Sequence, residues 1–167
     1  CSYLIPPVRE QYDRVWYSRA GLNEKHGTIS SLQADGWDVT VLSPVIPDSR
    51  GFDYHSAQRI RDEDREADVV VPPALNVFGV VPINYALTIL STILYALTLY
   101  RRFDDTVTLS YNFRPENALP GLAGKHLAGA TYVLQYEDGL FVHHSWLRRV
   151  SADVARRLCD GSLDGAI

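Results

Sequence analysis

The sequence predicts an α/β fold in which helices cover a mainly parallel β-sheet. Three observations predict it. Apolar strand-like and helix-like segments alternate along most of the chain, which is typical of parallel sheets. Residues 105–139 have the pattern strand, helix, strand. The composition, 46% hydrophobic and 22% charged over 167 residues, is that of one soluble domain with a sizeable core.

The first third of the chain predicts short elements joined by long loops. We expect a strand over residues 1–5, a polar loop with at most one helical turn over 8–25, and a short helix over 29–34. Gly36 follows that helix as a C-cap signal. Residues 37–42 alternate between polar and β-branched side chains, so a strand is expected there.

The middle of the chain contains a charged segment and then a long uncharged one. Residues 55–67 are charged almost throughout and predict an exposed connection or a helix, and 68–71 form a strand ended by two prolines. A helix is expected over 82–102. Residues 77–100 carry no charge. This uncharged segment is also long enough to span a bilayer. Its position between two strands favours a crossover helix, whose apolar excess would leave a patch for a peripheral membrane or partner contact.

The clearest unit of the sequence lies between residues 105 and 139. A β-branched strand is expected over 106–111, and Pro115 suits the first position of the following helix. Gly129 is its expected C-cap, and a second strand covers 131–136. The apolar residues at helical spacing, expected to face the core, are Ala118, Leu119, Leu122, Ala123 and Leu127.

Polar side chains follow both strands of this unit. The first cluster is Asn112, Arg114 and Glu116, and the second is Tyr136, Glu137 and Asp138. Ligands of open parallel sheets bind beyond the carboxyl ends of the strands, so the two clusters are candidates for one binding edge.

The C-terminal segment predicts one more helix and the start of a strand. Residues 146–158 form an amphipathic helix whose apolar positions are Leu147, Val150, Val154 and Leu158. Gly161 ends it, and residues 163–167 begin a strand. An unfinished sheet has unpaired N–H and C=O groups at its edge, so we expect self-association through that edge or the helix patch.

Several classes of function are disfavoured. The net charge of −4 and the absence of a basic run disfavour nucleic-acid binding. Two cysteines give no disulfide framework, which favours a cytoplasmic location. The five histidines are scattered, so neither a metal site nor a cofactor is expected.

The order of these features resembles the N-terminal domain of family 4-type glycosyltransferases, which have the two-domain GT-B fold. The blocks that carry the resemblance are SSLQADGWDVTVLSP (30–44), residues 101–139, His26-Gly27-Thr28 and SLDGAI (162–167). The resemblance implies a Rossmann-like, doubly wound, three-layer α/β/α domain over residues 1–167. This domain would be a truncated half, without the donor-binding C-terminal domain.

The same resemblance implies sugar transfer from a nucleotide-sugar donor to a glycan or lipid-linked acceptor, as in polysaccharide biosynthesis. Glu137 or Asp138 would orient the sugar or take a proton from the acceptor hydroxyl. Gly21, His26 and Gly27 would lie near the donor phosphates. The chain departs from the family where residues 19–25 replace a paired-glycine loop with Gly21 alone, and where Glu137 stands in place of a frequent histidine.

Other hypotheses stay open at this point. A non-catalytic α/β module that binds a nucleotide or a partner has the same fold class. A small membrane-anchored protein is a third reading of the uncharged segment. For the enzyme, we expect a cytoplasmic protein, peripheral on the cytoplasmic face of the membrane, whose isolated chain is inactive.

Overall fold

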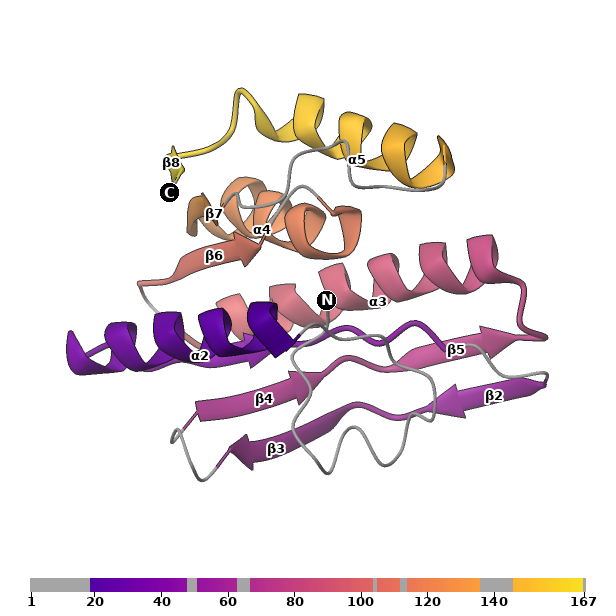
Figure 1. Ribbon diagram of the computed structural model, residues 1–167, viewed down its shortest axis with the longest axis horizontal. Helices are drawn as coiled ribbons and strands as arrows, with labels where there is room; N and C mark the ends of the chain where they lie inside the picture. Colours follow the sequence, from indigo (N-terminus) through magenta and orange to yellow (C-terminus); the bar gives the residue numbers. More distant parts are fainter. Residues whose placement is uncertain are drawn as a thin grey trace. The chain divides into compact units, whose positions relative to one another are not determined.

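The computed structural model describes residues 19–47, 51–62, 67–103, 105–111, 114–135 and 146–166 (Figure 1). The strand expected over residues 1–5 lies outside this description. Five successive strands follow helix α2, and from α3 onward helices and strands alternate, a mixture that agrees with the predicted α/β class. Contacts divide the chain into two compact units, Cys1–Ser91 and Thr92–Ile167, which are described separately. The Rossmann-like single domain stays a prediction.

The first unit contains a mixed three-stranded sheet. Its central strand is β4 (Ala67–Val71), which pairs in parallel with β1 (Thr40–Leu42) and antiparallel with β3 (Gln58–Asp62). Buried residues of β4 pack with Ile29 of helix α2 (Arg19–Ala34) and with Val45. β4 is buried on both faces, as the central strand of a layered α/β structure should be.

The described part of the charged segment 55–67 is not the connection or helix that its composition predicts, and residues 63–66 lie outside the described residues. It contains β3 and the end of β2 (Phe52–His55). In β3 the exposed Arg59 and Arg61 alternate with less exposed neighbours, and both arginines pair with Asp68 of the adjacent strand. Cross-strand ion pairs thus give a charged sequence a regular strand geometry. β2 pairs antiparallel with β5 (Ala74–Val77), a strand not predicted from the sequence.

Helix α2 is longer than predicted and β1 is shorter. The helix begins at Arg19, so residues 19–25 are helical and the expected loop is wrong there. The Gly36 C-cap is confirmed: its φ is 87°, and the N–H groups of Gly36 and Trp37 donate to the carbonyls of Gln33 and Leu32. β1 starts only at Thr40. Trp37, the expected first residue of this strand, lies before it and is 49% exposed.

Helix α3 (Val81–Tyr100) confirms the long helix predicted over residues 82–102. Its orientation is unusual because its buried residues include Asn84, Thr88 and Thr92, whereas Leu90 and Leu94 are exposed. Within the first unit, the Ser91 hydroxyl donates to the carbonyl of Pro73 over 2.5 Å and ties the helix to the β4–β5 connection.

The second unit confirms the predicted strand–helix–strand motif. β6 (Val107–Tyr111) and β7 (Thr131–Gln135) are parallel neighbours, joined by α4 (Pro115–Ala128). The strand expected near the C-terminus is present as β8 (Gly165–Ala166), parallel to β7, so the sheet order is β6-β7-β8. Gly129 ends α4 with a φ of 72°, as its C-cap role requires.

The buried face of α4 agrees with its predicted apolar stripe only in part: Ala118 is buried and Leu122 packs against the core cluster, as predicted. Leu127 is 72% exposed, whereas Gly121 and Gly124 are buried. A Cβ at Gly121 would overlap the ring of Tyr132, and one at Gly124 would lie 2.5 Å from Cε2 of Tyr100. Two aromatic rings occupy the space under the helix, so the face above them has to be made of small residues.

Helix α5 (Trp146–Cys159) is present as predicted, but its apolar stripe is not buried. Val150, Val154 and Leu158 are each at least 50% exposed, and the side chain of Leu147 lies outside the description. Ala155 and Cys159 are buried instead, in a cluster with Ala118 and Tyr132. As on α4, small side chains face the core because Tyr132 fills the space between the elements.

Candidate functional site

Strands β6 and β7 end at the same edge of the second unit's sheet. Their last residues, Tyr111 and Gln135, are direct register partners. Helix α4 begins at Pro115, shortly after the end of β6, so its N-terminus belongs to this edge as well. We call the edge formed by these two strand ends and the start of α4 the carboxyl edge.

Hydrogen bonds fix the start of α4 against the end of β6. The Asn117 amide donates to the carbonyl of Tyr111 over 2.8 Å, and the Ser110 hydroxyl donates to the carbonyl of Asn117 over 2.9 Å. Arg114 is the N-cap, with extended backbone, and its carbonyl accepts from the N–H groups of Asn117 and Ala118. The helix start therefore has a defined position relative to the strand end.

Asn117 is the residue of this edge that sequence reasoning missed. It occupies the third position of α4, where an asparagine side chain can bond to backbone outside the helix. The only signal in the sequence was an asparagine in the first helical turn after Pro115. Its partner depends on how the preceding loop closes, which the sequence pattern does not give.

Two of the six predicted edge residues lie within the description. Arg114 and Glu116 are both half-buried and flank Pro115 at the start of α4. The carboxylate of Glu116 suits the positive end of the helix dipole, and Arg114 adds a full positive charge at the same end. Asn112, Tyr136, Glu137 and Asp138 lie outside the described residues, and their site roles remain predictions.

Gly21, His26 and Gly27 all lie in helix α2 of the first unit, Gly21 in its first turn, and none of them lies in a loop. His26 and Gly27 are beyond the first turn, where backbone N–H groups bond within the helix. Gly27 is exposed, and a Cβ there would meet nothing within 4 Å, so no close approach requires a glycine. These residues are helical, so they form no glycine loop that could approach the donor phosphates.

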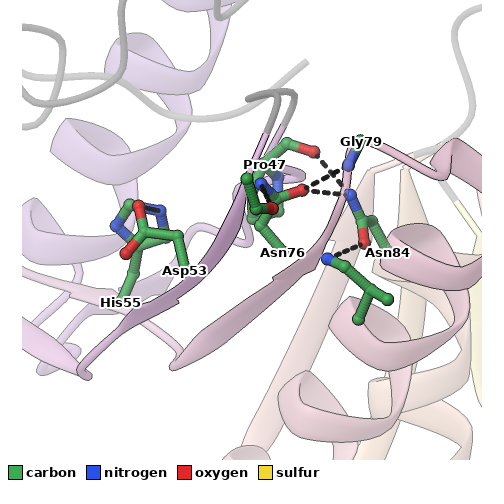
Figure 2. Close-up of polar contacts among 8 residues, drawn as sticks. Pro47, Asp53, His55, Asn76, Gly79 and Asn84 are labelled. Atoms are coloured by element: carbon green, nitrogen blue, oxygen red, sulfur yellow. Dashed lines mark hydrogen bonds and ion pairs between the residues drawn. The ribbon is translucent and has the colours of Figure 1, made fainter.

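The first unit contains a buried pair of asparagines that the sequence analysis did not single out (Figure 2). The amide of Asn84 on α3 donates to Oδ1 of Asn76 on β5 over 2.6 Å and to the carbonyl of Pro47 over 3.2 Å. Its own Oδ1 accepts from the N–H of Val77. Asn76 in turn donates to the carbonyl of Gly51 and accepts from the N–H of Gly79. Both side chains are fully buried and bonded to the chain, which identifies this Asn76–Asn84 clamp as structural.

Several acidic side chains of the described residues also have partners within the chain. On β2, Nε2 of His55 lies 3.3 Å from Oδ2 of Asp53 (Figure 2). Hydrogen bonds from Arg59 hold the pKa of Asp68 below its ordinary value. A hydrogen bond from Lys125, with a second from the backbone N–H of Tyr132, does the same for the pKa of Asp164. The partners of Asp68 and Asp164 thus stabilise these two carboxylates in their charged form.

Burial makes the Cys159 thiol a poor nucleophile. Removal from water raises the pKa of this thiol, and burial likewise raises the pKa of Tyr132, whose hydroxyl donates to the carbonyl of Ala118. Neutral forms are therefore favoured for both, and nucleophilic chemistry needs the thiolate. These two residues belong to the core, not to a reactive site.

Comparisons with known proteins add no assignment. No protein-family model, curated protein or solved structure matches this chain. Among the residues that the structure describes, no group of three or more histidine, cysteine or acidic side chains is placed to hold a metal ion. The resemblance to family 4-type glycosyltransferases rests on the sequence blocks alone.

Proposed function

We propose that this chain is the acceptor-side N-terminal domain of a GT-B glycosyltransferase, built on a Rossmann-like sheet. It would move a sugar from a nucleotide-sugar donor to a glycan or lipid-linked acceptor in the cytoplasm. The observation that supports this most is the register of β6 and β7, whose ends pair as Tyr111 and Gln135. Both polar clusters of the sequence directly follow these paired strand ends.

The proposed chemistry assigns different tasks to the two clusters. Glu137 and Asp138 follow Gln135 closely in sequence, and a carboxylate there takes the acceptor proton or orients the sugar. Arg114 and the N-terminus of α4 offer positive charge to the diphosphate, on which negative charge grows as the bond to the sugar breaks. Asn112, Glu116 and Tyr136 bind substrate hydroxyls.

The first experiment is sugar transfer by the protein that combines this domain with its donor-binding half. A panel of nucleotide sugars is offered with glycan and lipid-linked acceptors. Glu137→Gln should lower kcat by about 10²–10⁴-fold, the usual contribution of a general base. The matched control is Asp105→Asn, an exposed carboxylate that precedes β6 and so belongs to the opposite edge of the sheet. Its kcat should stay unchanged.

Three outcomes would contradict the proposal. Equal losses in Glu137→Gln and Asp105→Asn would remove the assignment of the catalytic edge. Robust transfer by residues 1–167 alone would contradict the two-domain interpretation. Tight nucleotide binding without transfer in either protein would favour the non-catalytic module.

A further inference from the structure

Helix α3 turns its polar side inward and its apolar side outward. The buried residues Asn84, Thr88 and Thr92 recur every four positions, so they share one face. On the opposite side Ile83, Leu90 and Leu94 are 46%, 53% and 56% exposed. Helices on the surface of a water-soluble protein normally have the reverse arrangement.

Hydrogen bonds fix this orientation. The Asn76–Asn84 clamp bonds α3 to β5 and to Pro47 (Figure 2). The Ser91 hydroxyl also bonds to the carbonyl of Pro73. A rotation that buried Leu90 would leave the buried partners of Asn84 unsatisfied, at a cost of about 1–3 kcal/mol for each group. The outward apolar face is therefore a stable feature of the fold.

The length and charge of the segment indicate what covers this face. Residues 69–100 include no charged side chain, and the exposed Arg101 and Arg102 follow immediately. By length and composition, α3 is the one helix among the described residues that could span a membrane, but 22% of its most apolar window is buried against the protein. Because the inner face is bonded to protein, only the outer face is free to enter an apolar phase.

We propose that the outer face of α3 docks on the surface of a lipid bilayer that contains anionic lipids. Ile83, Leu90 and Leu94 enter the boundary between headgroups and acyl chains, while Arg101 and Arg102 contact lipid phosphates. A second copy of the chain fits this face less well. Residues 69–100 contain no carboxylate, so α3 packed on α3 would give the arginines no anionic partner from the helix. The inference does not depend on the proposed glycosyl transfer.

The test is co-sedimentation of the purified chain with vesicles of phosphatidylcholine, alone or mixed with phosphatidylglycerol. The wild-type protein should bind the anionic vesicles. The double variant Leu90→Asn/Leu94→Asn should lower the partition coefficient by about 10²-fold or more, because two leucine side chains no longer enter the membrane. Its control is Leu127→Asn, an exposed leucine on α4 that lies outside this face and should leave binding unchanged.

The arginines are tested separately. Arg101→Gln/Arg102→Gln should weaken binding to anionic vesicles by about tenfold or more and leave binding to neutral vesicles unchanged, since each basic residue contributes about 1 kcal/mol near an anionic surface. Added salt should have the same effect on the wild type. Circular dichroism melting of each variant checks that the fold is retained.

Four results would overturn the inference. The first is that the wild type binds neither kind of vesicle, and the second is that Leu127→Asn loses as much vesicle binding as Leu90→Asn/Leu94→Asn. The third is binding that resists alkaline carbonate, which indicates a spanning helix. The fourth is a dimer in sedimentation velocity that Leu90→Asn/Leu94→Asn dissociates, which would assign the face to a second copy.

Discussion

The two edges of the sheet in the second unit use their polar side chains differently. At the amino edge, the Asp164 carboxylate accepts hydrogen bonds from Lys125 and from the N–H of Tyr132. Nε2 of His126 lies 3.1 Å from Oγ of Ser162. These contacts fasten β8 and the end of α4 to β7. At the carboxyl edge, Asn117 fixes the helix start, and the charged groups of Arg114 and Glu116 stand at the end of a helix dipole. Polar side chains at the amino edge thus pair with one another, whereas the carboxyl edge combines structural bonds with the charged groups of the proposed site.

The largest expected effect is a loss of stability when a side chain is added at Gly121, where α4 packs against Tyr132. Gly121→Ala places a methyl group in the ring of the buried Tyr132, and should lower the free energy of unfolding by about 2–3 kcal/mol. Gly27→Ala is the matched control, because its methyl group would meet nothing within 4 Å. It should raise stability by about 0.5–1 kcal/mol through helix propensity. Urea denaturation measures both, and equal changes would contradict the close packing of α4.

A pair of charge-neutralising variants compares the two edges directly. Arg114→Gln should lower kcat/KM of the proposed two-domain enzyme by about tenfold, the value of one charge-assisted hydrogen bond, with little change in melting temperature. Lys125→Gln should leave kcat/KM unchanged and lower the melting temperature slightly, because its bond to Asp164 is lost. The reverse pattern would show that the roles of the edges have been exchanged.

The smallest effect is a pH dependence at the amino edge. The folded-state pKa of Asp164 is lowered by Lys125 and by the N–H of Tyr132, so its stabilising contribution is present above its unfolded pKa of about 4. The contribution is lost as the pH falls through the lower folded pKa. Melting temperatures of wild type and Asp164→Asn should therefore differ at pH 7 and converge below about pH 4. A difference that persists at low pH would show that the charge of Asp164 is not the cause.

Local signals in the sequence predicted the second unit well. Pro115 and Gly129 mark the ends of α4, and the β-branched runs on either side form parallel strands. Parallel pairing alone places both strand ends at one edge, so the carboxyl edge could be predicted without coordinates. The pairing of Tyr111 with Gln135 and the bond from Asn117 could not, because both depend on how the loop closes.

Periodicity predicted helices but not their buried faces. Of the predicted stripes, Ala118 on α4 is buried, but Leu127 on α4 and Val150, Val154 and Leu158 on α5 are exposed. On α3, for which no buried face was predicted, polar residues face inward. Tyr132 and Tyr100 require glycine and alanine above them, and the Asn76–Asn84 clamp requires an asparagine on α3. These partners come from distant parts of the chain. The strand β3 was missed for a similar reason, since Arg59 and Arg61 pair with Asp68 across the sheet.

Hydrogen–deuterium exchange of the proposed two-domain enzyme, with and without a nucleotide sugar, tests the proposed site most directly. The donor should slow exchange in peptides that cover residues 110–118 and 135–139, the carboxyl edge and the segments that follow its strands. Peptides covering residues 124–132, at the amino edge, should exchange at the same rate in both states. Protection confined to the amino edge, or donor binding that protects neither edge, would contradict the assignment of this site.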